Sequence, residues 1–241
     1  MKAAFFTVCG GGDDYEFLLG SIEHHATMGY HVVLDTTPPE RAKKFRNLPD
    51  TVFWIHEPFY GSGWANFQLR TAAERARKIA KHVDAEVLIY MDSDDFYIPE
   101  TKDTIFPLAK YYGVELNYVH WKPDGKPYTF GASEWHLRMW NRDANVTINL
   151  NLAWPVHPKY NGNPEHHPVP VSPPELQVVR AHGCWRHHVH YALGEKAKEQ
   201  STAVTTIMGW PDKGTLVQPV AWPTKLALWR DKGIKPSESF L

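Results

Sequence analysis

The amino-acid sequence predicts an α/β protein whose mostly parallel sheet is flanked by helices, with a less regular C-terminal half. Short apolar runs alternate with helical patterns through the first half of the chain, as in βαβ proteins. The runs are apolar almost throughout, which is typical of strands buried on both faces. Loops that contain Gly or Asp follow several of these runs, at the edge where such sheets bind ligands.

The first half contains the clearest elements. The apolar run at residues 3–8 ends in three glycines, so we expect a buried strand that leads into a loop. Residues 66–83 carry leucine and alanine at helical spacing and form the clearest expected helix. The expected strands of this half are residues 3–8, 31–34, 51–55 and 86–91, and the expected helices are residues 15–27, 41–45 and 66–83.

The second half is rich in Pro, Trp and His. Residues 154–174 contain many prolines, and a regular helix cannot persist there. Trp, Tyr and His side chains lie between these prolines, so we expect a functional loop rather than a linker. The expected elements of this half are strands at residues 115–121, 127–130 and 175–181, a short element at residues 134–141, and a helix at residues 189–199.

Composition bounds the class of protein. A chain of 241 residues with 43% hydrophobic content predicts a single domain over residues 1–241. Lys and Arg number 26 against 27 for Asp and Glu, so no excess charge points to nucleic acid or to a membrane surface. Two cysteines are too few for a disulfide framework. With no signal peptide and no long apolar run, we expect no membrane span and a soluble, cytoplasmic protein.

An acidic cluster, Asp92-Ser93-Asp94-Asp95, follows the apolar run at residues 87–91. Carboxylates so close together repel one another unless a cation lies between them. Hard divalent cations such as Mn²⁺ or Mg²⁺ take oxygen ligands, and diphosphate oxygens can complete their shell. The cluster therefore predicts a metal site, the alternative being a solvated turn whose aspartates cap a helix.

The apolar strand and its Asp-Ser-Asp-Asp end resemble the aspartate motif of GT-A-fold glycosyltransferases, especially family 2. In that family a helix with an Asn or Arg-Asn start precedes the motif, and Asn66 and Arg70 stand at about the right distance here. The resemblance covers roughly residues 3–140. It implies a Rossmann-like GT-A sheet and the transfer of a sugar, with inversion, from a nucleoside-diphosphate sugar, UDP-sugar favoured, to an acceptor hydroxyl. Residues 1–112 would bind the donor, and residues 113–241 the acceptor and a lid.

The resemblance also implies roles for single residues. Asp92, Asp94 and Asp95 would form the metal site, with Asp92 also facing the ribose or uracil. The residues expected to bind the nucleotide are Thr7, Cys9, Gly10, Asp35, Arg70 and Asp92. The first loop departs from the family, because Gly10-Gly11-Gly12-Asp13-Asp14 replaces the usual Pro-x-Tyr-Asn start, which leaves the base open.

An inverting transferase needs a carboxylate that removes the proton of the acceptor hydroxyl. The usual acidic pair is absent downstream, and Glu134 and Glu165 are the two candidates. Arg138 and Arg142 are each expected to contact the diphosphate or to pair with a carboxylate. The residues expected to bind the acceptor are Trp135, Arg138, Trp140 and His166.

Four histidines and one cysteine gather within nine residues, at His182, Cys184, His187, His188 and His190. On a strand, His188 and His190 would share a face, whereas on a helix His187 would align with Tyr191. The resemblance makes His187 or His188 a further metal ligand and places Trp185 and Arg186 in a lid over the diphosphate. A structural zinc site is the alternative.

Other functions remain open at this point. A nucleotidyltransferase of related fold is one, although Asp13 and Asp14 stand where its loop would need positive charge. A metal-dependent hydrolase that uses the histidines is another, and a carbohydrate-binding module built on tryptophans is a third. The acceptor of a glycosyltransferase could be a glycan, a protein or a modified pyrimidine in DNA.

Overall fold

The structure is a computed structural model of the chain. No helix in its described part is both long enough and apolar enough to cross a membrane. Residues 66–67, 149–153, 166–169 and 215–216 are described by their backbone. The described residues are 1–10, 15–45, 47–59, 66–98, 100–122, 125–129, 135–153, 166–189, 215–216, 227, 229 and 231–232.

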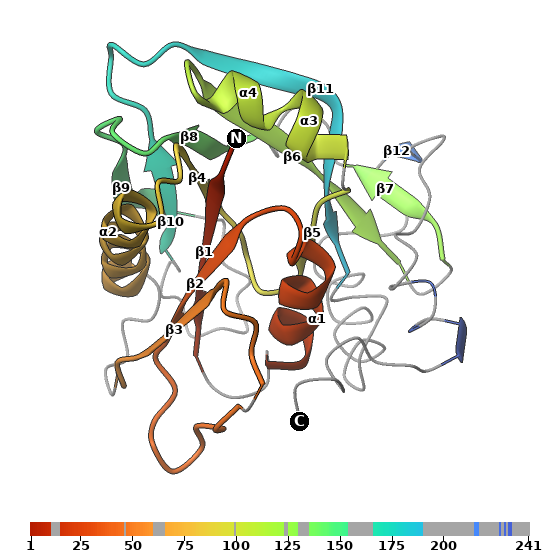
Figure 1. The fold of residues 1–241 in the computed structure, drawn as a ribbon. Helices are drawn as coiled ribbons and strands as arrows, with labels where there is room; N and C mark the ends of the chain where they lie inside the picture. The colour runs from red at the N-terminus through yellow and green to blue at the C-terminus, as the bar shows by residue number, and fades with distance from the viewer. Residues whose placement is uncertain are drawn as a thin grey trace.

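Four parallel strands form the N-terminal half of the sheet, in the order β3-β2-β1-β4 (Figure 1). β1 lies between β2 and β4, so the chain adds strands first on one side of β1 and then on the other. Sheets with this order bind ligands outside the carboxyl ends of the strands where the order reverses, which here are β1 and β4. The strand bounds are β1 Ala3–Cys9, β2 Tyr30–Asp35, β3 Val52–His56 and β4 Val87–Tyr90.

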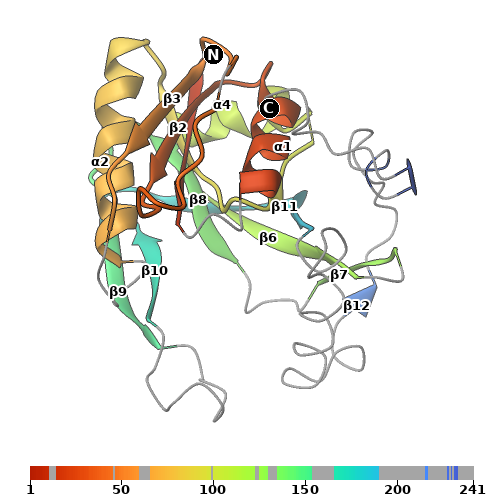
Figure 2. The same cartoon turned by 90° about the horizontal axis from the view of Figure 1, so that it is seen from below.

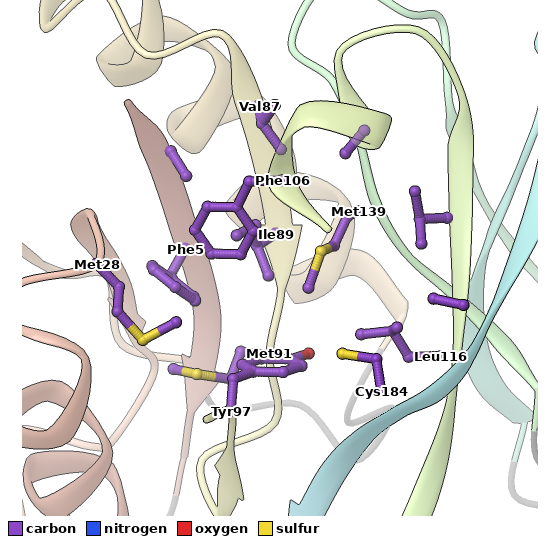
Figure 3. Close-up of a cluster of buried hydrophobic side chains, with 14 residues drawn as sticks. Phe5, Met28, Val87, Ile89, Met91, Tyr97, Phe106, Leu116, Met139 and Cys184 are labelled. Carbon is purple, nitrogen blue, oxygen red and sulfur yellow. The ribbon is translucent and has the colours of Figure 1, made fainter. Parts of the chain in front are cut away.

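Alternate residues of β1 and β4 enter two separate cores. Phe5 and Ile89 face the core on the side of α3 and α4, together with Phe106 and Met139 (Figure 3). Phe6 and Leu88 are the neighbours of Phe5 and Ile89 in sequence. Because successive side chains of a strand alternate, they point to the opposite face. Both faces are thus covered, which explains why these strands are apolar at successive positions.

The helices cover both faces of the sheet (Figures 1 and 2). α2 packs mainly on β1 and β2 through a narrow stripe of Leu69, Ala72, Ala76 and Ala80, whose small side chains permit close approach. α1 lies beside the short strand β5. The helix bounds are α1 Tyr15–His25, α2 Asn66–His82, α3 Glu100–Thr104 and α4 Phe106–Ala109.

The second half of the ten-stranded sheet is mixed. β8 pairs antiparallel with both β4 and β6, and β11 runs parallel to β6 and antiparallel to β5. Apart from the sheet, β9 and β10 form an antiparallel pair. The bounds are β5 Asp95–Phe96, β6 Gly113–Trp121, β7 Pro127–Thr129, β8 His136–Asn141, β9 Thr147–Ala153, β10 His166–Val171, β11 Val178–His188 and β12 Thr215–Leu216.

The architecture confirms an α/β protein with a mostly parallel sheet, since only β5, β7 and β8 run against the other seven strands. Residues 41–45 form no helix, contrary to expectation. Residues 166–171, expected to belong to a loop, form a strand. Its prolines are tolerated because β9 is its single strand neighbour within the described residues and the pairing has a bulge there. The helix expected at residues 189–199 falls outside the described residues except for Val189, which is not helical.

Gly29, just before β2, is required by a close backbone approach. A Cβ atom at this position would lie 2.5 Å from the carbonyl oxygen of Ala3. We expect Gly29→Ala to lower the free energy of unfolding by about 3 kcal/mol, because backbone must move to relieve the overlap. Gly125→Ala is the control: its φ is 75°, and an added Cβ would meet no atom of the described residues within 4 Å, so it should cost about 1 kcal/mol. Equal losses in urea denaturation would contradict the packing argument.

Candidate metal centre

The acidic cluster lies where β4 ends, and β11 brings a histidine to it from the C-terminal half. His188 is the register partner of Asp95 in the antiparallel β5–β11 pair. β11 also pairs in parallel with β6, so it has a strand neighbour on each side. Asp94, immediately before β5, accepts a backbone hydrogen bond from Val189 at 3.3 Å. Two carboxylates and one imidazole therefore converge from segments more than 90 residues apart.

Their ligand atoms have a spacing that suits a divalent cation. His188 Nδ1 lies 3.3 Å from Asp94 Oδ2 and 3.8 Å from Asp95 Oδ1. One ligand atom from each of the three residues lies within 4.8 Å of the other two. Ligands about 2.1 Å from an octahedral ion are about 3.0 to 4.2 Å apart. Asp95 Oδ1 is buried and has no hydrogen-bond partner in the described part of the chain, so the donor set fits a cation.

Asp92, in contrast, is held by side chains of the protein. Arg138 Nη2 lies 3.0 Å and Arg186 Nη1 3.6 Å from its Oδ2. The hydroxyl groups of Tyr90 and Tyr118 donate to its two oxygens at 2.6 and 2.8 Å. With two hydroxyl donors and two ion pairs around it, Asp92 anchors the two arginines rather than presenting free oxygens to a metal.

The arginines are themselves stacked on the tyrosines. Arg186 Cζ lies 3.4 Å from the ring centre of Tyr118, and Arg138 Cζ lies 4.1 Å from that of Tyr90. Burial alone would raise the pKa of Asp92, but Arg138 and Arg186 together with the two hydroxyl groups outweigh it and hold that pKa well below its usual range. Asp92 is therefore a carboxylate at neutral pH.

The cluster is close to electrically neutral without a metal. Its three carboxylates face two guanidinium groups, and Arg186 also lies 3.2 Å from Asp95 Oδ2. Burial alone would lower the pKa of His188, but the negative charges of Asp94 and Asp95 outweigh this effect and raise the pKa to about 9. With His188 protonated, three positive charges match the three negative charges of the carboxylates. A divalent cation that replaced this proton would leave the cluster with net positive charge, which suits an anionic ligand.

His187, the other expected ligand from this segment, points to the opposite face of β11. Its Nδ1 accepts a hydrogen bond from Trp121 Nε1 at 3.0 Å. Burial, with a smaller contribution from His24, lowers its pKa to about 3. Because successive side chains of a strand alternate, the structure brings only His188 of the two to the aspartates.

The residues expected to bind the nucleotide lie in different settings. Thr7 and Cys9 are buried in β1, and Gly10 follows them at the end of that strand. Asp35, at the end of β2, is 1% exposed and accepts hydrogen bonds from Tyr15, Trp54 and the backbone of Thr37. These donors occupy both of its oxygens, so Asp35 ties β2 to α1 and β3.

Arg70 and Trp140 contact other parts of the protein. Arg70 is exposed on α2 and donates to the carbonyl of Ile148. Trp140 is 1% exposed and packs edge-on against Phe6 in the core, so it lines no surface that an acceptor could reach.

The remaining residues expected at the acceptor side divide into three groups. Arg138 belongs to the Asp92 network. Trp135 is half-buried beside His182 and Arg180 on the outside of the sheet. The two expected bases, Glu134 and Glu165, and the side chain of His166 fall outside the described residues.

Three residues around Asp92 were not expected from the sequence to hold it: Tyr90, Tyr118 and Arg186. Arg186 was expected in a lid, yet it is fully buried in β11. Its signal was a charged residue between two aromatic neighbours, Trp185 and His187, because a charge placed among such side chains requires a partner if it is buried. Tyr90, two residues before the acidic cluster, carried a comparable signal of a polar tip at a strand end.

A search against protein-family models finds none that matches this chain, and a search of curated proteins finds no relative.

Proposed function

We propose that the protein is a metal-dependent glycosyltransferase of the GT-A type that moves a sugar from a nucleoside-diphosphate sugar to an acceptor hydroxyl. The observation that carries the proposal is the convergence of Asp94, Asp95 and His188 at the carboxyl end of β4. This end lies next to the carboxyl end of β1, where sheets of this order bind nucleotides.

The polar surroundings support an anionic donor. Arg138 and Arg186 each keep two buried N–H-bearing nitrogens that have no hydrogen-bond partner within the described residues. Buried donors are seldom left in this state, and a phosphate oxygen or an ordered water would satisfy them. The net positive charge of the cluster with a metal in place favours a diphosphate for the same reason.

The donor set favours Mn²⁺, with Mg²⁺ as the second choice. Two carboxylates suit either ion, whereas an imidazole nitrogen suits transition metals better than Mg²⁺. Asp94, Asp95 and His188 would hold the ion, and the ion would supply positive charge to the departing diphosphate. Glu134 or Glu165 remains our proposed base, and the acceptor is a glycan, a protein or a modified DNA base.

A thermal-stability titration with nucleoside diphosphates and UDP-sugars, with and without Mn²⁺, tests the proposal. A ligand at one hundred times its dissociation constant stabilises the folded state by about 2.7 kcal/mol. We expect a stabilisation that needs both the nucleotide and Mn²⁺ in the wild type and that is lost in Asp94→Asn. The control is Asp143→Asn, an exposed carboxylate beside Arg142, which should keep the full effect.

Two other results would point elsewhere. Stabilisation by Mn²⁺ with no further effect of any nucleotide would favour a metal-dependent hydrolase built on the same three residues. Stabilisation by a nucleotide that is equal with and without Mn²⁺ and unchanged in Asp94→Asn would remove the metal centre from the proposal.

A further inference from the structure

The short strand β5, which contains the proposed metal ligand Asp95, has one edge that no strand of the described residues covers. β11 is its strand neighbour within the described residues. An uncovered edge leaves backbone N–H and C=O groups unpaired, and buried groups of this kind must find partners elsewhere. The helix α1 runs beside this edge (Figure 1).

Three side chains on one face of α1 take the place of the missing strand. Ser21 Oγ donates to the carbonyl of Asp95 at 3.0 Å. The backbone N–H of Tyr97 donates to His25 Nε2 at 2.8 Å, and His24 Nε2 lies 2.6 Å from the carbonyl of Tyr97. Positions 21, 24 and 25 share a face because residues three and four apart are neighbours on a helix.

The donors and acceptors permit one arrangement of protons. A carbonyl only accepts, so His24 Nε2 carries its proton and donates to Tyr97. His25 Nε2 accepts from a backbone N–H, so the neutral ring carries its proton on Nδ1, which lies 3.2 Å from Ser21 Oγ. Ser21 accepts there and donates its own hydroxyl hydrogen to the carbonyl of Asp95 at 3.0 Å, a stronger acceptor than Met91 Sδ at 3.3 Å. The hydrogen bonds thus form a chain from Tyr97 through His25 and Ser21 to Asp95.

We infer that Ser21, His24 and His25 are positioning residues that fix the backbone of β5 and so aim the Asp95 carboxylate at the metal. Two buried anchors two residues apart leave the intervening backbone little freedom to rotate. Side chains that orient a metal ligand through such contacts commonly change metal affinity 10–100-fold when they are removed. The inference rests on the proposed metal centre.

His31 offers a matched control for a merely structural role. Like His25 it is fully buried and stacks on Phe5, at a ring distance of 4.9 Å against 5.1 Å for His25. Its buried Nε2 makes no hydrogen bond to the acidic loop. Replacing it therefore damages the same core, including its own stack on the ring of His25 at 6.1 Å, and removes none of the hydrogen bonds from α1 to the acidic loop.

The test is a titration of the metal-free protein with Mn²⁺ alone, read from the electron paramagnetic resonance signal of the free ion, with urea denaturation in parallel. We expect Ser21→Ala and His25→Leu to raise the dissociation constant 10–100-fold. His25→Gln, whose amide oxygen can accept from Tyr97, should stay within a few-fold of the wild type. His31→Leu should lose stability and keep its affinity.

Two outcomes separate the inference from the function on which it rests. If the wild type binds Mn²⁺ but Ser21→Ala and His25→Leu bind it as tightly as the wild type, or at least as tightly as His31→Leu, the positioning role alone is overturned. A wild-type protein that binds no Mn²⁺ removes the metal centre itself, and with it both the proposed function and this role.

Discussion

Replacing Arg186 by Met is expected to lower the free energy of unfolding by about 3–5 kcal/mol, because it leaves buried carboxylates without their partner. Arg186 is fully buried and lies 3.2 Å from Asp95 and 3.6 Å from Asp92. Met has a similar volume, so the loss reflects charge more than a cavity. Urea denaturation of the metal-free protein at pH 7 measures it.

Arg180→Met provides the control on the same strand. Arg180 pairs with Glu115 at 2.9 Å, but its side chain is half-exposed, and such surface pairs contribute less than about 1 kcal/mol. Saturating Mn²⁺ should reduce the loss in Arg186→Met, since a cation on Asp95 replaces part of the missing charge. Similar losses in the two variants would show that the Arg186 network contributes no special stability.

Below pH 6.5 the protein is expected to lose stability because of its buried histidines. Burial lowers the pKa of His31 to about 4, against 6.5 in an unfolded chain. Between these values the unfolded state binds a proton that the folded state does not, so stability falls as the pH falls. Each pH unit in that window removes about 1.4 kcal/mol, or about 3 kcal/mol in all from His31.

His31→Phe should remove this contribution while keeping the stack on Phe5. The quantity to follow is the difference in unfolding free energy between variant and wild type from pH 8 to pH 4. It should be constant above pH 7 and shift by about 3 kcal/mol in favour of the variant by pH 4. Val32→Ala, in the same strand but without a titrating group, should differ from the wild type by a constant amount. A constant difference for His31→Phe would contradict the assignment.

Local patterns were enough to predict the four parallel strands and the two longer helices of the first half, but not β5, α3 or α4. The strands β1 to β4 and the helix α2 follow from apolar runs and helical spacing, which are patterns contained within each short segment of sequence. β11 illustrates the limit. Only its first residues were expected as a strand, because residues 182–188 are mostly polar, and they become a strand through pairing with β6 and β5 far away in the sequence.

The candidate site was predictable in part for the same reason. The aspartates stood next to one another, so their cluster was visible directly. The choice between His187 and His188 required knowing that the segment is a strand and which face meets β5. Arg138 and Arg186 lie 48 positions apart in the chain, and no spacing rule relates them to Asp92. Burial turns these charges into partners, and burial of a polar residue is a property of the whole fold.

The β5–β11 pairing also sets an order of events during folding. The residues that it joins, such as Asp95 and Arg186, are 91 positions apart, so closing this loop costs chain entropy before any contact forms. The β1–β2 and β2–β3 pairs join residues that are 26 and 21 positions apart, such as Ala4 with Tyr30 and His31 with Val52, and can assemble first. During synthesis, the acidic loop would therefore emerge with its carboxylates uncompensated. It would gain Arg138 when β8 emerges, and Arg186 and His188 only when β11 leaves the ribosome. A metal ion available at that stage would act as a temporary counter-charge for the nascent chain.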